Sequence, residues 1–363
     1  MQLAVATTGG GVELASWLVN HPGASRAIVE VQVPYSEAAL ASYLGCAGPH
    51  RVEEKTAREL AGRAYARAVE FSGREEGVIG VGCTAALATN RARRGEDRAC
   101  IGLRLGDEYR FYTLQFAKGA ADRIAQEEAL SRFALAAVAE ACGGVFAVDL
   151  PPYAEFSRRS LALDDPLSLL FDGELDLVEM DANGAVAAEV ARDHRLLFSG
   201  SFNPLHEGHR QLARAASRLS GRAPCWELSV VNVDKPPLPR AEVGRRLQAL
   251  RGEFAAVVTR APTFLEKARL FTGCHFAVGY DTAARLLQEK YYEGGERGMA
   301  AALDELAAGG HRFWVAGRLQ EGTYQTLEDL DLPRAASALF ASIPESEFRM
   351  DISSTQLRAG KDK

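Results

Sequence analysis

The chain has few features that would point to an extracellular, membrane-bound or fibrous protein. Its six cysteines are scattered over 363 residues without a Cys-x-x-Cys pair or any spacing typical of metal ligands. We therefore expect reduced, mostly buried thiols in a cytoplasmic protein. No apolar run is long enough to span a membrane, and the first residues lack the basic and apolar regions of a signal peptide. Low-complexity tracts and fixed-period repeats are also absent.

The charge is also unexceptional. There are 42 Lys and Arg against 48 Asp and Glu, which gives a net charge of −6, and no block of basic residues. This argues against a nucleic-acid partner and leaves small anionic substrates to be held by a local site. No dense carboxylate cluster is present to cage a metal ion, so we expect no protein-held metal. The length suggests two domains, each large enough for its own core.

Residues 195–209 and the helical stretch that follows carry the clearest functional signal. Residues 196–198 form a short apolar run before a glycine, as in a buried parallel strand, and residues 211–219 have helical character. His206 and His209 therefore lie where a tight loop enters a helix. The exposed N–H groups and macrodipole of a helix N-terminus attract phosphate, and imidazoles add donors for charge on a transferring phosphoryl group.

The run Gly200-Ser-Phe-Asn-Pro-Leu-His-Glu-Gly-His209 resembles the HxGH signature of the nucleotidyltransferase (cytidylyltransferase-like) superfamily. That superfamily includes the nicotinate and nicotinamide mononucleotide adenylyltransferases. The resemblance implies a Rossmann-like domain with a parallel sheet. It also implies transfer of a nucleotidyl group from a nucleoside triphosphate, with Mg²⁺ supplied with the nucleotide, to a phosphorylated acceptor.

Three later positions extend the resemblance. Lys235 follows the next apolar strand, Gly279-Tyr-Asp281 is similar to a V-G-x-D run, and residues 352–358 read Ile-Ser-Ser-Thr-Gln-Leu-Arg, close to the superfamily's I-S-S-T-x-x-R. The resemblance implies catalytic roles for His206, His209, Lys235 and Arg358. It implies nucleotide contacts for Gly200, Ser201, Phe202, Asn203, Gly208, Gly279, Asp281, Arg318, Ser353, Ser354 and Thr355.

The first half alternates strands and helices, which predicts a three-layer α/β domain. It resembles the C-terminal domain of the competence-damage-inducible (CinA) family, whose active members deamidate nicotinamide mononucleotide. In that family a serine in A-E-S-C-T-G-G is the nucleophile and Y-S-N-x-x-K supplies a lysine. Here Ala6 and Leu40 stand at those two positions, although the turn glycines and Tyr35 are kept. We expect a non-catalytic domain that binds a ligand or forms a homo-oligomer; Thr7 or Thr8 as a substitute nucleophile is the alternative.

These observations predict two domains joined by a short connection. We assign residues 1–165 to the CinA-like domain, residues 166–193 to a packed β-ribbon with an Asn-Gly turn, and residues 194–363 to the nucleotidyltransferase domain. The first choice of reaction is adenylyl transfer from ATP to a nicotinamide- or nicotinate-type mononucleotide. Phosphopantetheine, or a phosphorylated alcohol with CTP, remains open as acceptor. A nucleotide-binding sensor or scaffold without turnover is the alternative of another class.

Overall fold

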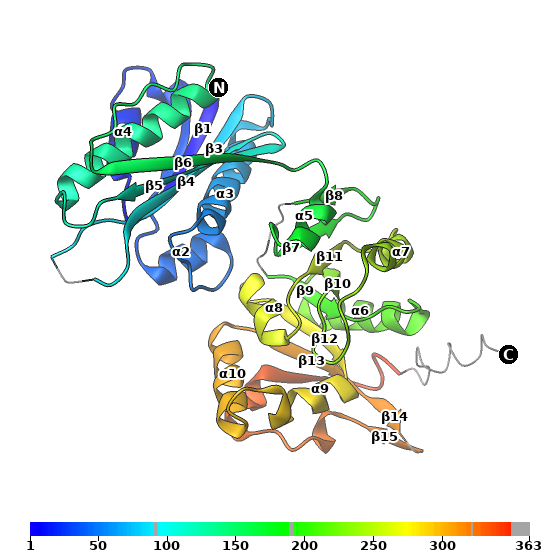
Figure 1. Ribbon diagram of the computed structural model, residues 1–363. Helices are drawn as coiled ribbons and strands as arrows, with labels where there is room; N and C mark the ends of the chain where they lie inside the picture. The colour runs from blue at the N-terminus through cyan, green and yellow to red at the C-terminus, as the bar shows by residue number, and fades with distance from the viewer. Residues whose placement is uncertain (91–92, 189–191, 193, 321, 350–363) are drawn as a thin grey trace. The chain divides into compact units, whose positions relative to one another are not determined.

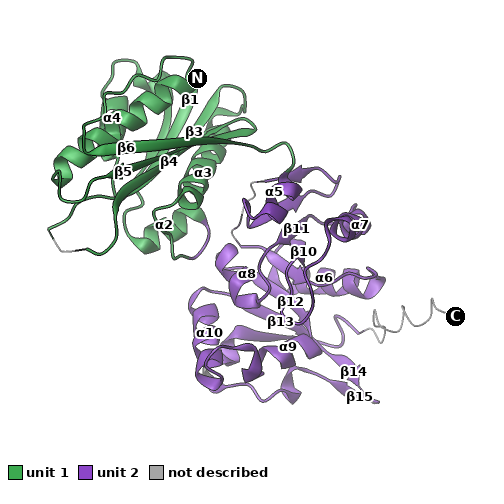
Figure 2. Cartoon of the chain, viewed as in Figure 1, with its two compact units in different colours: residues 1–44, 48–165 green, residues 45–47, 166–363 purple. Residues whose placement is uncertain are grey.

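The computed structural model describes residues 1–90, 93–188, 192, 194–320 and 322–349, which divide into two compact units (Figure 2). Unit 1 consists of residues 1–44 and 48–165, and unit 2 of residues 45–47 and 166–363. Each unit has its own sheet flanked by helices, so the predicted two-domain α/β class is confirmed. Within the described ranges, no helix combines the length and apolar character needed to cross a bilayer.

Unit 1 is built on a six-stranded sheet in the order β2-β1-β3-β4-β5-β6 (Figure 1). β1 pairs in parallel with β2 and β3, and the remaining neighbours are antiparallel. The strands are β1 (Gln2–Thr8), β2 (Ile28–Gln32), β3 (Val78–Ala86), β4 (Asp97–Leu105), β5 (Glu108–Phe116) and β6 (Ala154–Ala162). The α-helices are α1 (Val12–Val19), α2 (Glu37–Leu44), α3 (Glu54–Ser72) and α4 (Arg123–Ala141).

Small residues let α3 lie directly on the sheet of unit 1. A Cβ at Gly80 would lie 2.1 Å from the carbonyl oxygen of Ala61, and one at Gly82 would lie 2.3 Å from that of Ala57. Because side chains alternate between faces along a strand, Val81 points to the opposite face. There it packs in a core with side chains of α1 and α4, including Phe133. The unit therefore has the three layers expected from its sequence.

Unit 2 contains an eight-stranded sheet in the order β16-β13-β12-β9-β10-β11-β7-β8. The six strands from β16 to β11 are parallel to one another. β7 pairs antiparallel with β11, and β8 pairs antiparallel with β7. The strands are β7 (Leu177–Met180), β8 (Val186–Ala187), β9 (Leu196–Ser199), β10 (Pro224–Ser229), β11 (Ala256–Thr259), β12 (His275–Gly279), β13 (Arg312–Ala316) and β16 (Phe340–Ile343). Counted from β9, the parallel strands lie in the order 3-2-1-4-5-6, which is the Rossmann arrangement.

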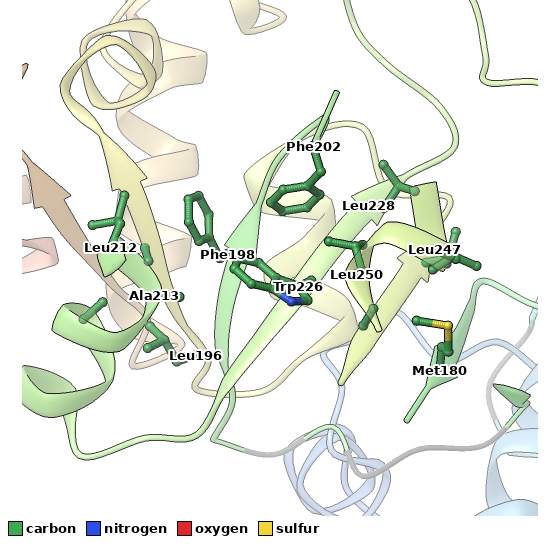
Figure 3. Packing of buried hydrophobic residues seen from close by; sticks show 14 of the residues in the cluster. Met180, Leu196, Phe198, Phe202, Leu212, Ala213, Trp226, Leu228, Leu247 and Leu250 are labelled. Atoms are coloured by element: carbon green, nitrogen blue, oxygen red, sulfur yellow. The ribbon is translucent and has the colours of Figure 1, made fainter. Parts of the chain in front are cut away.

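Helices cover both faces of this sheet, because its buried parallel strands are apolar on both sides. Trp226 on β10 is fully buried on the face that also packs α6 and α7, and Figure 3 shows it beside Phe198 and Phe202. The neighbouring Cys225 lies in the core of the opposite face, which packs α8, α9 and α10. These helices are α6 (Glu207–Ser220), α7 (Arg240–Leu250), α8 (Phe264–Leu270), α9 (Tyr280–Leu286) and α10 (Glu296–Ala308).

Residues 166–188 and 192 are the described part of the segment expected to form a packed β-ribbon between the two domains. The segment begins with α5 (Pro166–Asp172) and continues into a β7–β8 hairpin. The turn at Gly184 has a φ of 97° and is closed by hydrogen bonds to Asp181, as an Asn-Gly hairpin requires. β7 pairs with β11, so the hairpin extends the second sheet. Pairing with β11 satisfies backbone N–H and C=O groups of β7 that would otherwise need other partners.

Candidate functional site

The strand order of unit 2 defines where a ligand should bind. In an open parallel sheet the crevice lies beyond the carboxyl ends of the strands, where the chain order reverses, which here is between β9 and β12. β9 ends at Ser199 and leads into residues 200–209, which we call the HxGH loop. β12 ends at Gly279, and β13 ends two residues before Arg318. Topology thus places the HxGH loop, Gly279 and Arg318 at one edge of the sheet.

The HxGH loop is held at its start by backbone and aromatic contacts. The Gly200 N–H donates to the carbonyl of Glu227 at 3.1 Å. Phe202 has a φ of 45°, unusual for an aromatic residue, and its ring is buried against Phe198 and Trp226 (Figure 3). A Cβ at Gly200 would lie 2.9 Å from the Phe202 ring. The buried position of the Phe202 ring therefore requires a residue without a side chain at position 200.

His206 and His209 lie side by side at the N-terminus of α6. His206 is the N-cap residue, and the two ring centroids are 3.7 Å apart with the planes 25° from parallel. The His206 N–H donates to Nδ1 of His209 at 3.2 Å. A neutral imidazole that accepts at Nδ1 carries its proton on Nε2, so His209 keeps one N–H donor for another partner.

The environment of both rings favours the neutral imidazole. Burial, together with the neighbouring His206, lowers the pKa of His209 to about 3. Phe198 and Phe202 provide part of that burial, since their centroids lie 5.7 and 5.4 Å from the His209 ring. Burial also lowers the pKa of His206. At neutral pH the pair can donate hydrogen bonds, whereas positive charge must come from α6 itself or from basic side chains.

The two basic side chains expected at the site, Lys235 and Arg318, differ in their contacts. Lys235 lies in the loop after β10 and is exposed. Arg318, on β14 (Arg318–Gln320), forms an ion pair with Asp281. Gln320 also donates to Asp281, and the Tyr280 hydroxyl donates to Gln325 on β15 (Thr323–Gln325) at 3.2 Å. The structure therefore brings Asp281 and Arg318 together, and the carboxylate of Asp281 balances the charge of the arginine.

Comparison with known proteins agrees with this geometry. No family model matches the chain. A probable nicotinate-nucleotide adenylyltransferase from Gloeobacter violaceus is 31% identical over 173 residues, which cover 45% of this chain and 81% of that protein. The chain belongs to the nicotinate-nucleotide adenylyltransferase family. The resemblance stated from the HxGH run is thereby confirmed, and membership makes this chain a nucleotidyltransferase relative.

Solved structures of CinA-superfamily proteins are also similar to this chain. Those from Enterobacter cloacae, Escherichia coli and Agrobacterium tumefaciens share 17%, 20% and 19% identity, with TM-scores of 0.33, 0.32 and 0.32. Each similarity covers 39% of this chain, and it covers 82%, 81% and 84% of the three solved chains, respectively.

In this member of the adenylyltransferase family, the described residues include only part of the predicted site. Ser353, Ser354, Thr355 and Arg358 lie outside the described residues. Three groups that sequence reasoning missed lie beside the HxGH loop on α7, namely Glu242, Arg245 and Arg246. An acidic residue followed three and four residues later by arginines is common on helices, so no local pattern indicated a role at this site.

The low pKa of His209 makes a prediction about pH and stability. The folded protein keeps this ring neutral down to about pH 3, whereas the unfolded chain protonates it below about 6.5. The stability contributed by the neutral ring is therefore complete above pH 6.5 and is lost as the pH falls below it. We expect the free energy of unfolding to drop more between pH 7.5 and 5 in the wild type than in His209→Gln. Urea unfolding at the two pH values measures this difference, and identical pH dependences would contradict it.

The residues of unit 1 at the positions of the CinA amidase site have structural contacts of their own. Ala6 is fully buried and Leu40 is 6% exposed, so both aliphatic side chains pack in the interior. The Thr7 hydroxyl donates to the carbonyl of Gly10, and the Thr8 hydroxyl donates to that of Pro34 at 2.9 Å. Tyr35 is 64% exposed. Neither threonine hydroxyl bonds to a base in these contacts, which is what a nucleophilic role would require.

A carboxylate from α4 fills the N-terminus of α1 next to this place. Glu127 accepts hydrogen bonds from the backbone N–H groups of Gly11, Val12 and Glu13 at 2.9, 2.6 and 3.3 Å. Gly11 has a φ of 80°, which allows the turn to present these groups together. The chain thus supplies its own anion where the turn would otherwise attract one.

We expect Glu127→Ala to destabilise unit 1 by about 1.5–3 kcal/mol, because three donors at a helix N-terminus lose a charged acceptor. Glu128→Ala is the matched control on the same helix, since Glu128 pairs only on the surface with Arg132. It should cost less than about 0.5 kcal/mol. Calorimetry combined with amide hydrogen exchange at residues 11–13 measures both effects. Equal losses in the two variants would contradict the capping role.

Proposed function

We propose that unit 2 transfers the adenylyl group of ATP to a nicotinate- or nicotinamide-type mononucleotide and releases pyrophosphate. The observation that carries this proposal is the pair of neutral, stacked histidines at the N-terminus of α6, at the switch point of a Rossmann-ordered sheet. The relative from Gloeobacter violaceus, described as a probable nicotinate-nucleotide adenylyltransferase, favours nicotinate mononucleotide as the acceptor.

In the proposed reaction a phosphate oxygen of the acceptor attacks the α-phosphorus of ATP in line. The bond from that phosphorus to the bridging oxygen breaks, and its electrons leave with pyrophosphate. His209 donates from Nε2 to oxygens that gain charge, and the N–H groups of α6 act in the same direction. No covalent intermediate with the protein is needed, so catalysis comes from positioning and charge stabilisation.

The remaining charges of the triphosphate would be met by basic and hydroxyl side chains. Lys235 is exposed, and Arg318 would exchange Asp281 for a phosphate oxygen. We assign Ser354, Thr355 and Arg358 to the leaving pyrophosphate on their sequence pattern. The nearby carboxylates of Asp281 and Glu242 already bind arginines, which fits Mg²⁺ held by the phosphates rather than by the protein. When bound with the nucleotide, Mg²⁺ neutralises phosphate charge.

Pyrophosphate release by the full chain tests the proposal. ATP and CTP are each combined with nicotinate mononucleotide, nicotinamide mononucleotide, phosphopantetheine and a phosphorylated alcohol. We expect turnover with ATP and a pyridine mononucleotide. Turnover only with CTP or with another acceptor would overturn the substrate assignment. Nucleotide binding without pyrophosphate release from any pair would instead identify a sensor or scaffold.

A further inference from the structure

Two arginines of α7 hold the first part of the HxGH loop. Arg246 donates from Nη1 to the carbonyl of Ser201 at 2.8 Å, and Arg245 donates from Nη2 to Oδ1 of Asn203 at 3.2 Å. Arg246 is only 8% exposed, so its guanidinium is fixed by packing and not merely by surface contact. The two contacts lie on either side of Phe202.

Glu242 holds both arginines in place. Its carboxylate accepts from Nε of Arg246 at 2.7 Å, and from Nε and Nη2 of Arg245 at 2.8 and 2.7 Å. These hydrogen bonds lower the pKa of Glu242 to about 2, so the carboxylate stays charged across the physiological range. Glu242 also lies in the first turn of α7, where the helix dipole favours an anion.

An anchor is needed at this point because the loop conformation is not intrinsically favourable. Phe202 adopts a φ of 45°, which costs free energy in a residue with a side chain and persists only where the surroundings fix it. The centroid of the Phe202 ring lies 5.4 Å from that of the His209 ring, so a shift of the loop changes the packing around His209. Misplacement by about 1 Å can cost a reaction about 10²-fold.

We propose that Arg246 is a positioning residue for nucleotidyl transfer: by binding the Ser201 carbonyl, with Glu242 holding its guanidinium, it fixes the first part of the HxGH loop and with it the Phe202 ring that packs against His209. This inference rests on the proposed function for its kinetic consequence. The anchoring itself is independent of substrate, because every contact in it lies within the protein.

The test compares Arg246→Gln with Arg246→Lys, Glu242→Gln and a matched control in the full chain. Arg210→Gln is the control, because the Arg210 side chain also binds a carboxylate, but that of Glu253 at 2.9 Å, which lies outside the HxGH loop and outside α7. Melting temperature, kcat, KM for both substrates and hydrogen exchange of the peptide covering residues 201–206 are measured for each variant.

We expect Arg246→Gln to lower kcat by about 10- to 100-fold with less than about threefold change in either KM, and to speed exchange in residues 201–206. Glu242→Gln should act in the same direction, and Arg246→Lys should recover part of kcat. Arg210→Gln should keep kcat within about twofold. A rise in KM with unchanged kcat would overturn the inference in favour of direct substrate binding, as would equal losses in the control.

The exchange measurement separates this inference from the proposed function. If the wild type releases no pyrophosphate with any acceptor, the proposed function fails, but faster exchange in Arg246→Gln still supports the anchor. Unchanged exchange in Arg246→Gln, with exchange elsewhere as in the wild type, overturns the anchor whether or not the protein turns over.

Discussion

His209→Ala should lower kcat for pyrophosphate release by about 10²- to 10³-fold while leaving the affinity for ATP within about threefold. The reason is that the Nε2 donor stabilises charge that develops only as the phosphoryl group is transferred. Single-turnover kinetics and equilibrium binding of ATP measure the two quantities separately. A sensor without turnover would have no kcat to lose.

His275→Ala is the matched control for this experiment. His275 is another partly buried histidine of unit 2, and burial with nearby arginines and histidines lowers its pKa to about 4. It begins β12, at the amino end of the parallel sheet, and its Nδ1 accepts from the indole of Trp314 at 3.1 Å. We expect kcat to remain within a few-fold of the wild type. Equal losses in both variants would show that His209→Ala acts through general destabilisation and would remove its catalytic assignment.

Lys267→Met should destabilise unit 2 by about 3–5 kcal/mol. The ammonium of Lys267 lies 2.9 Å from Oε2 of Glu227, whose side chain is fully buried on β10. The Thr259 hydroxyl donates to the other carboxylate oxygen at 2.6 Å. Removing the lysine leaves a fully buried carboxylate without its counter-charge. Urea unfolding followed by the fluorescence of buried Trp226 measures the loss.

Two further variants distinguish a buried ion pair from an ordinary surface pair. Glu227→Gln combined with Lys267→Met should recover at least about 2 kcal/mol relative to Lys267→Met, because no charge is then left buried. Arg269→Met, on the same helix, removes a surface pair with Glu305 whose side chains are 42% and 45% exposed. It should cost less than about 1 kcal/mol. A similarly small loss in Lys267→Met would show that Glu227 is not held as a buried anion.

The fold class was readable from the sequence because the strongest elements are locally encoded. The apolar run at residues 196–198, which a glycine follows closely, is typical of a buried parallel strand, and it lies in β9 as predicted. Helix α4, Arg123–Ala141, also has a local start signal, because it is capped by Asp122, whose carboxylate accepts from the Ala125 N–H at 2.8 Å. The HxGH run also predicted the family, through its resemblance to the superfamily's signature and not through any local geometry.

Elements that depend on distant partners were not found in this way. β6, residues 154–162, has mostly exposed side chains and no apolar alternation, and it exists because it pairs with β5 along its whole length. The β7–β8 hairpin was expected from its Asn-Gly turn, but its place beside β11 was not. The Arg246 anchor spans 45 residues, and no local pattern indicates that its guanidinium meets a particular carbonyl.

The amino-acid sequence by itself determined the α/β class and the HxGH loop at the start of a helix, since each depends on the pattern of neighbouring residues, and its resemblance to a known signature predicted the nucleotidyltransferase superfamily. Only the tertiary structure decided that His209 is neutral with its proton on Nε2, that Asp281 holds Arg318, and that Glu127 caps α1. Protonation and pairing depend on burial and on the distance between groups far apart in the chain, and neither quantity exists before the chain folds.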